Sequence, residues 1–156
     1  MNAITLLWAR ASQRWTSRDV SRLASIFLAV GTGVVIGIAI WLEPSPLGHS
    51  THMQLGLNTC SFLSATGYPC PMCGATTTFT LMAHLRPLQA LATQPFAALL
   101  FCMTVGVFGV SVAEVLQPRD RWIRFSDWIE PWEGRLAVGF LGFMALAWFY
   151  KIYLMG

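Results

Sequence analysis

Two cysteines in a short polar stretch, Cys70 and Cys73, have the Cys-Pro-x-Cys-Gly spacing that lets two thiolates act together. The proline stiffens the turn, and the glycine that follows allows backbone N–H groups to turn toward the sulfur atoms. Such a pair supplies half of a tetrahedral zinc or iron site, or it exchanges disulfides as a dithiol. The stretch around residues 66–79 is therefore the candidate site.

A metal site needs two more ligands than this pair supplies. One cysteine lies upstream of the pair, and one histidine lies downstream on a short apolar segment. Thiolate and imidazole are the ligands that structural zinc and iron sites use. The candidate metal ligands are Cys60, Cys70, Cys73 and His84, and His49 or His52 can substitute for His84.

The same cysteines support two other interpretations. If Cys73 opens a helix, the helix dipole and N–H groups stabilise a thiolate and lower its pKa, which favours thiol–disulfide exchange. On an oxidising side of a membrane, a disulfide among Cys60, Cys70 and Cys73 would tie the loop down. A structural clip, a functional metal site and thiol exchange all stay open. Cys102 lies in the middle of an apolar run, where we expect a small packing residue.

Several classes of function find no support in the sequence. The chain has no phosphate-binding glycine loop, no Gly-x-Ser-x-Gly and no His-Glu-x-x-His. Its apolar runs hold no histidine and no deep charge, which argues against ion translocation and against a His-ligated tetrapyrrole. Glu43 and Glu114 stand at the ends of apolar runs, where we expect solvated carboxylates. We therefore identify no catalytic residue and no cofactor-binding residue, and favour a non-catalytic protein over an enzyme.

The elements that must position the cysteines are membrane helices. The chain of 156 residues is 55% hydrophobic and only 11% charged. Three apolar stretches, at about 23–42, 95–116 and 136–155, are each long enough to cross a bilayer as a helix. Pro95 is a favourable first helical residue, and Lys151 is expected to extend its ammonium to the headgroups. The first stretch is too long for a signal-peptide core, so we expect it to be retained.

The distribution of arginine predicts the orientation, because cytoplasmic flanks of spans are enriched in Lys and Arg. The external region 43–94 contains a single one, Arg86. We therefore place the N-terminus in the cytoplasm and the cysteine loop and C-terminus on the other side. The net charge of +3 follows from this topology and requires no nucleic-acid partner. The flanking arginines are Arg10, Arg14, Arg18, Arg22, Arg119, Arg121, Arg124 and Arg135.

The remaining segments are predicted to lie at the membrane surface. Residues 1–22 and 117–135 alternate arginine with aromatic and apolar residues, as amphipathic interfacial helices do. Ala75 to Leu85 is apolar but too short to span, so we expect a re-entrant or interfacial helix there. The predicted fold is a single all-α integral membrane domain over residues 1–156, with three spans, this short helix and two surface helices.

Small and aromatic residues indicate where other membrane proteins would pack. Gly33-Val-Val-Ile-Gly37 is a small-xxx-small pattern that lets helix backbones approach closely. Indole rings in the second surface segment either anchor it at headgroup level or form a docking face. The candidate partner-binding residues are Gly33, Gly37, Trp122, Trp128 and Trp132.

The region from Cys60 to Phe96 resembles a family of small bacterial membrane proteins catalogued as domain of unknown function 2752. The family pattern has an upstream Cys, Thr-Gly, then Cys-Pro-x-Cys-Gly-x-Thr-Arg, a short apolar helix and Asn-Pro before the next span. Thr77 stands where the family has Arg, and Gln94 where it has Asn, so an activity that depends on that Arg is not expected here. The matching residues are Cys60, Thr66, Gly67, Cys70, Pro71, Cys73, Gly74, Thr76, His84 and Pro95.

The resemblance implies a bacterial inner-membrane location and carries no biochemical role. Together with the glycine and tryptophan faces, it favours a non-catalytic accessory or scaffold subunit of a larger inner-membrane complex, in contact with lipid and with other membrane-protein subunits. The alternative is a membrane thiol oxidoreductase or metal-binding protein that uses Cys70 and Cys73.

Overall fold

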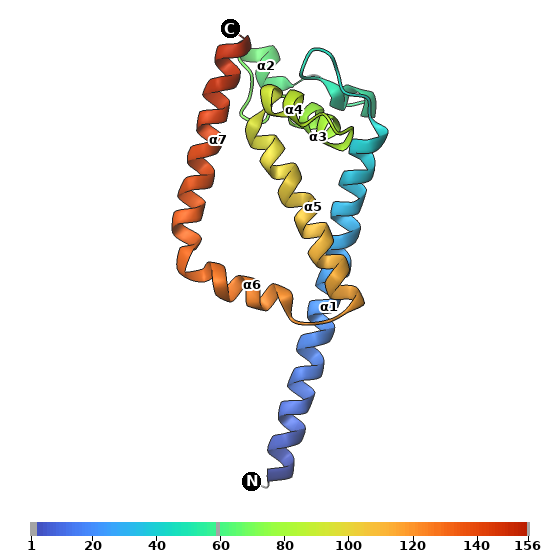
Figure 1. The fold of residues 1–156 in the computed structure, drawn as a ribbon. Coiled ribbons are helices and arrows are strands. Elements are labelled where there is room, and N and C mark those ends of the chain that lie inside the picture. The colour runs from blue at the N-terminus through green and yellow to red at the C-terminus, as the bar shows by residue number, and fades with distance from the viewer. Residues whose placement is uncertain (1–2, 59, 156) are drawn as a thin grey trace.

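The protein was analysed as a computed structural model that describes residues 3–58 and 60–155, with side chains for 20–58 and 60–154. All regular secondary structure in the described part is helical, and this part contains no strand. Three segments are long and apolar enough to cross a membrane: Val20–Trp41, Pro95–Leu116 and Arg121–Leu154. The predicted all-α membrane fold is confirmed, and it fits a multi-pass membrane protein in contact with lipid (Figure 1).

The elements follow one another with short connections. In chain order they are α1 (Ala3–Trp41), η1 (Thr51–Leu55), α2 (Ser61–Thr66), α3 (Ala75–Ala83), α4 (Pro87–Thr93), α5 (Pro95–Leu116), α6 (Arg121–Ile129), η2 (Glu130–Trp132) and α7 (Glu133–Met155).

Helix α5 has the bounds predicted for the second span, because its start is encoded locally. Pro95 occupies the first turn, where a missing N–H costs nothing. The side chain of Gln94 accepts a hydrogen bond from the Ala97 N–H at 3.1 Å and so caps the helix. The third span falls within α7, and the first falls within α1 except for its last residue, Leu42.

Helix α1 differs from the prediction, because residues 3–22 and the first span form one continuous helix (Figure 1). The segment before the span contains neither glycine nor proline, so nothing in it ends the helix. The predicted surface helix over 1–22 is therefore the first half of α1. Residues 1 and 2 and the side chains up to residue 19 lie outside the described part.

Helices α1 and α5 pack along each other. A Cβ atom on Gly33 would lie only 3.1 Å from the Phe108 ring of α5. Gly33, predicted to bind a partner, therefore serves packing within the chain. At Gly37 no described residue lies within 4 Å of where a Cβ would stand. Of the two glycines, only Gly37 therefore remains a predicted partner-binding residue.

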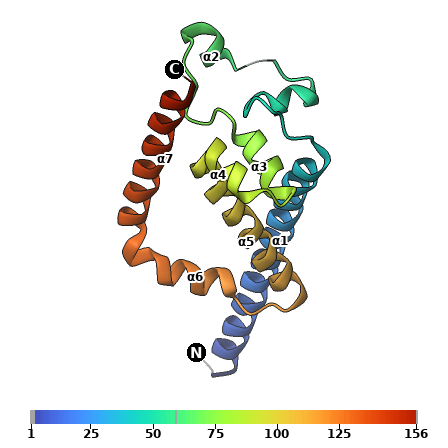
Figure 2. The same cartoon turned by 45° about the horizontal axis from the view of Figure 1, so that its top comes forward.

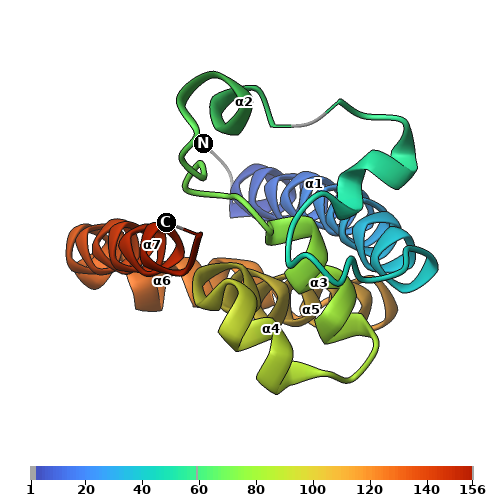
Figure 3. The ribbon, with the colours of Figure 1, turned by 90° about the horizontal axis from the view of Figure 1, so that it is seen from above.

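The loop 43–94 folds over one end of these two helices. Seen from above in Figure 3, α3 and α4 lie across the start of α5, and α3 also contacts α1. Helix α3 confirms the predicted short helix, whereas α4 was not predicted and restarts at Pro87, which occupies its first turn. The core gathers at this end of the molecule, where Phe79 and Phe101 meet edge to face at 5.3 Å between centroids.

The second surface segment is confirmed as helical and forms α6 and η2. Helix α6 crosses from the end of α5 to the start of α7, which then returns to the cysteine loop, so the three helices form three sides of a frame (Figures 1 and 2). Phe96 of α5 contacts Phe140 and Phe143 of α7, with ring centroids 4.8 and 6.0 Å apart.

The connection between α5 and α6 corrects the prediction of a solvated Glu114. This side chain is only 1% exposed. Its carboxylate accepts backbone hydrogen bonds from Arg119, Asp120 and Arg121 at 2.8 to 3.2 Å, and an ion pair from Arg121 Nη1 at 3.1 Å. Asp120 has φ 55°, which turns the chain back so that these N–H groups surround the carboxylate. Glu43, in contrast, is exposed.

Candidate functional site

Three cysteines that are separate in sequence line one cavity of about 340 Å³. Cys60 and Cys70 are half-buried, and Cys73 is buried, with 6% of its surface exposed. All four cysteines of the chain are free thiols. Cys102, expected to be a small packing residue, is exposed on α5 and does not pack inside the described chain.

The histidines near the cysteines are not the one that was preferred as a metal ligand. His49 and His52, named as substitutes, line the cavity with the cysteines. His84 caps the opposite end of α3, about 14 Å from the first helical residue Ala75 by the helical rise, and its Nδ1 pairs with the Thr80 carbonyl at 2.8 Å. The structure therefore does not bring His84 into the cavity that the three cysteines line. Within the described ranges, no cluster of three or more His, Cys, Asp or Glu side chains has the proximity needed to hold a metal ion.

The Cys-Pro-Met-Cys segment is a tight turn closed by its own backbone. The Cys73 N–H donates to the Cys70 carbonyl at 2.9 Å. Gly74 follows with φ 87°, and a Cβ there would lie 2.6 Å from the Gly48 carbonyl oxygen. Glycine is required here twice over, because L side chains rarely adopt this φ and because a second backbone passes so close. The turn therefore leads directly into α3.

Side chains from two distant helices hold the same turn from outside. Trp148 of α7 donates its indole N–H to the Pro69 carbonyl at 2.8 Å, and Gln94 donates its amide to the Pro71 carbonyl at 2.8 Å. These two carbonyls lie on either side of Cys70. Each such bond contributes about 1 kcal/mol when its groups are buried. The position of Cys70 is thus fixed by α5 and α7 as well as by the turn.

Lys151 of α7 reaches this region, which corrects the prediction that its ammonium extends to the headgroups. The residue is only 5% exposed. Its Nζ donates to the Thr93 carbonyl at 3.2 Å and to the Gly48 carbonyl at 3.4 Å, and it would lie 3.3 Å from a Cβ on Gly74. The third span therefore places a cation next to Cys73.

The three thiols differ in acidity. The pKa of Cys60 is lowered chiefly by the backbone N–H of Leu63, with a smaller contribution from the Cys70 side chain. Burial raises the pKa of Cys70. Burial also raises the pKa of Cys73, although the charge of Lys151 offsets part of that rise. Cys60 is therefore the thiol with the largest thiolate fraction near neutral pH.

The two departures from the family pattern both have structural roles here. Thr77 is fully buried on α3, and its hydroxyl lies 2.7 Å from that of Thr51. Gln94 both caps α5 and bonds to the cysteine turn. Gln94 thus serves as a capping side chain in this chain, while the hydroxyl pair joins α3 to η1.

Sequence analysis missed Trp148 and Lys151 as parts of the site, because an interfacial Trp and a terminal Lys are ordinary at the end of a span. The available signal was the position of Lys151: it is the single charged residue between Arg135 and Gly156. A single Lys at this position can bind another part of the chain as well as anchor the helix at the lipid headgroups.

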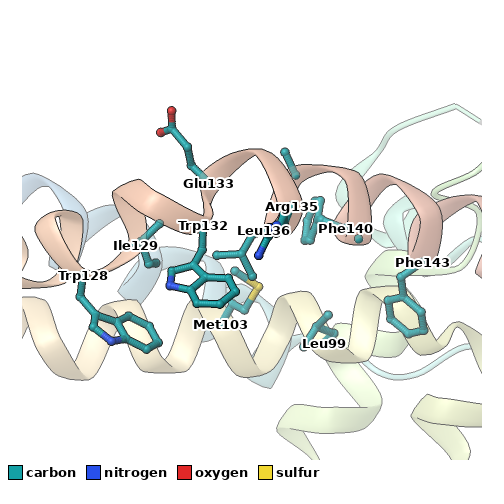
Figure 4. A pocket seen from close by; sticks show the side chains of 12 residues that line it. Leu99, Met103, Trp128, Ile129, Trp132, Glu133, Arg135, Leu136, Phe140 and Phe143 are labelled. Atoms are coloured by element: carbon teal, nitrogen blue, oxygen red, sulfur yellow. The ribbon is translucent and has the colours of Figure 1, made fainter.

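A second, larger hollow of about 890 Å³ lies between α5 and α7, and we call it the interhelical groove. Figure 4 shows Trp132, Leu136 and Met103 pointing into it, with Glu133 directed away. Trp128 and Trp132, predicted to bind a partner, line this groove, whereas Trp122 does not. Its lining residues are Leu99, Met103, Trp128, Ile129, Trp132, Glu133, Arg135, Leu136, Ala137, Gly139, Phe140 and Phe143.

Comparison with known families identifies residues 60–108 as a match to the family described as protein of unknown function (DUF2752). The match covers the cysteine cavity from Cys60 through α3 and α4 to the middle of α5, and so confirms the resemblance for this segment. Comparison with curated proteins and with solved structures gave no match.

Proposed function

We propose that this chain is a non-catalytic accessory subunit of a larger bacterial inner-membrane complex, and that it holds a transmembrane helix of a partner protein in the interhelical groove. The observation that carries the proposal is the groove itself. It runs along α7 from Leu136 to Phe143, about two helical turns, and is lined almost entirely by apolar side chains.

The groove has features that suit a helix more than an acyl chain. Gly139 faces it, and the described residues leave the space around a Cβ at this position open. A small residue of this kind lets a second helix backbone approach closely, which lipid chains do not require. Trp128 and Trp132 close the end of the groove at the surface segment, so the occupant has a defined depth.

Orientation is part of the proposal. The arginine-rich segments favour a cytoplasmic N-terminus and a cytoplasmic α6, with the cysteine loop and the end of α7 in the periplasm. The surface helix α6 would then anchor the groove at the cytoplasmic headgroups, and the cysteine cavity would lie on the periplasmic side.

The test compares two glycines on the same helix. Gly139→Leu fills the groove, whereas Gly142→Leu adds the same side chain at a position that does not line it; the described residues leave the Cβ position open at both glycines. Native mass spectrometry in mild detergent should show a defined complex for wild type and Gly142→Leu, and its loss in Gly139→Leu. A wild-type chain that carries only lipid in the groove, or pairs only with itself, would contradict the proposal.

The second candidate function is a membrane thiol oxidoreductase or metal-binding protein. It is favoured by a specific observation, the convergence of Cys60, Cys70 and Cys73 with His49 and His52 on one cavity. The thiol form of this candidate needs a pair of cysteines that interact, and the metal form needs ligands in addition to Cys70 and Cys73. Reversible oxidation of the purified chain distinguishes thiol chemistry from a scaffold that uses its cysteines only for stability.

A further inference from the structure

We propose that this chain binds one anionic phospholipid, with the headgroup in the cysteine cavity and an acyl chain in an apolar groove that adjoins it. This groove has a volume of about 300 Å³ and is lined by residues of α1, α3 and α5, and we call it the α1–α3 groove. It shares no lining residue with the interhelical groove. The lipid site is therefore separate from the surface to which the accessory role was assigned.

The cysteine cavity and the α1–α3 groove are continuous with each other. Met72, Ala75 and Thr76 line both of them. Beyond these three residues, the cavity is lined mostly by cysteine, histidine, serine and threonine side chains. The rest of the groove is lined by apolar side chains, among them Phe79 and Leu100. A site that is polar at one end and apolar at the other fits an amphipathic ligand.

The α1–α3 groove has the depth of a single leaflet. Val35, Ile38 and Leu42 line it along α1, and Val35 lies about 10 Å from Leu42 by the helical rise. Leu42 directly follows the last residue of α1, so this end of the groove lies near the headgroups. The hydrocarbon of one leaflet is about 15 Å thick. The groove thus ends before the bilayer midplane, which fits an acyl chain, whereas a partner's transmembrane helix would continue past it.

The polar end of the site favours an anionic headgroup. The first turn of α3 lines the cavity, and the backbone N–H groups of Thr76 and Thr77 have no acceptor among the described residues. Free N–H groups at the start of a helix, together with the helix dipole, attract an anion. The described residues that line the cavity include no Asp or Glu to oppose it.

A buried cation beside the cavity adds to this preference. Lys151 donates to two backbone carbonyls, but the single ion pair among the described residues joins Arg121 and Glu114. The Lys151 Nζ would lie 3.3 Å from a Cβ on Gly74, which precedes α3 and lines the cavity. Burial of an ammonium without a negative partner is costly. A lipid phosphate in the cavity would supply that negative charge.

The first measurement uses the cysteines of the wild-type chain as reporters. The full chain, reduced and delipidated in a neutral detergent, is titrated with phosphatidylglycerol or with phosphatidylcholine that has the same acyl chains. Peptide mass mapping then gives the rate at which N-ethylmaleimide alkylates each cysteine. Cys102 is exposed on α5 and lines neither hollow, so it reports any general effect of the lipid on the reagent.

Phosphatidylglycerol should protect the cysteines of the cavity. At a concentration about ten times its Kd, alkylation of Cys60 and Cys70 should slow roughly tenfold relative to Cys102. Phosphatidylcholine at the same concentration should protect them clearly less, because its headgroup carries no net negative charge. This measurement requires no variant, so its outcome does not depend on whether a substituted chain folds.

A pair of variants assigns the binding to this site. Ala75→Phe fills the junction between the cavity and the α1–α3 groove, whereas Ala65→Phe adds the same ring at an exposed position of α2 that lines neither. Native mass spectrometry should show one phosphatidylglycerol retained by wild type and by Ala65→Phe, with an affinity at least about tenfold lower in Ala75→Phe. Circular dichroism checks the helix content of both variants.

Three results would overturn the proposal. Equal protection by the two lipids would remove the preference for an anionic headgroup. An absence of protection by either lipid would remove the site, and so would unchanged lipid retention in a folded Ala75→Phe chain. None of these results bears on the interhelical groove, because the comparison of Gly139→Leu with Gly142→Leu measures the retention of a partner protein.

Discussion

Cys60, Cys70 and Cys73 line one cavity, but the surroundings of each sulfur atom set a different acidity. The pKa of Cys60 is lowered by the Leu63 N–H, and the pKa values of Cys70 and Cys73 are raised by burial. Since the thiolate is the reactive form, reaction with a maleimide or iodoacetamide depends on pH through these values.

We predict that Cys60 in the reduced protein is alkylated first and reaches its maximal rate at the lowest pH of the three. Below its pKa a thiol gains about tenfold in thiolate for each pH unit, so Cys70 and Cys73 should continue to accelerate at pH values where Cys60 has levelled off. Peptide mass mapping between pH 6 and pH 10 measures the three rates together. Faster reaction at Cys73 than at Cys60 would contradict the prediction.

Gly74 and Gly67 permit a matched test of close backbone approach. Both have positive φ, 87° and 74°, but only Gly74 has the Gly48 carbonyl oxygen 2.6 Å from where a Cβ would stand. Gly67→Ala should cost about 1–2 kcal/mol of the free energy of unfolding through backbone strain alone. Gly74→Ala should cost clearly more, because the loop and the turn must also separate. Denaturant titration in detergent compares the two, and equal losses would show that the contact is unimportant.

At the scale of the elements, the junction of α5 and α6 depends on one carboxylate. The buried Glu114 carboxylate accepts hydrogen bonds from three backbone N–H groups and forms an ion pair with the Arg121 guanidinium. The N-terminal turn of α6 is thereby supplied with an acceptor, since its residue Asp120 makes no side-chain cap. The direction in which α6 leaves α5 follows from this cluster.

Glu114→Ala is therefore expected to lower the free energy of unfolding by about 3 kcal/mol, because it leaves several buried donors without an acceptor. Glu43→Ala is the matched control: it removes the same side chain at the end of another span, but Glu43 is exposed and should cost less than about 0.5 kcal/mol. Thermal unfolding in detergent provides the comparison. A similar small loss for both variants would mean that α6 is positioned by other contacts.

These two glutamates also show what sequence can predict at this scale. The bounds of helix α5 were predicted correctly, because hydropathy and a proline at the first helical position are local properties. The difference between Glu43 and Glu114 was not, since it arises from the turn at Asp120, where a residue other than glycine adopts φ 55°. The continuity of α1 was missed for the opposite reason: a change from charged to apolar composition does not end a helix.

The site was predictable to a similar degree. The three cysteines were identified as one group from their spacing and residue type. Lys151 and Trp148 were not identified, because their contacts with Gly48 and Pro69 join residues 103 and 79 positions apart. His84 was misplaced because its spacing from Cys73 suits a ligand set, whereas α3 in between holds the two residues at opposite ends.

For the whole molecule, the arginine distribution gives a testable orientation. With Cys102→Ser, a membrane-impermeant maleimide added to intact bacterial spheroplasts should label Cys60 in the periplasm. A cysteine introduced at the exposed Ser126 of α6 should be labelled only after permeabilisation. The reverse pattern would place the cysteine cavity in the cytoplasm, where thiols are kept reduced.

The hydrogen bonds between the end of α7 and the cysteine loop form late in biosynthesis. Cys60, Cys70 and Cys73 are synthesised early, and the helix that carries Trp148 and Lys151 is made last. At common translation rates the interval between Cys73 and Lys151 lasts roughly 4–16 s. During this interval the three cysteines have been synthesised, but Lys151, whose ammonium will face Cys73, has not. The contacts of Trp148 and Lys151 with the loop form only after α7 inserts, so maturation of the cavity is coupled to completion of the chain.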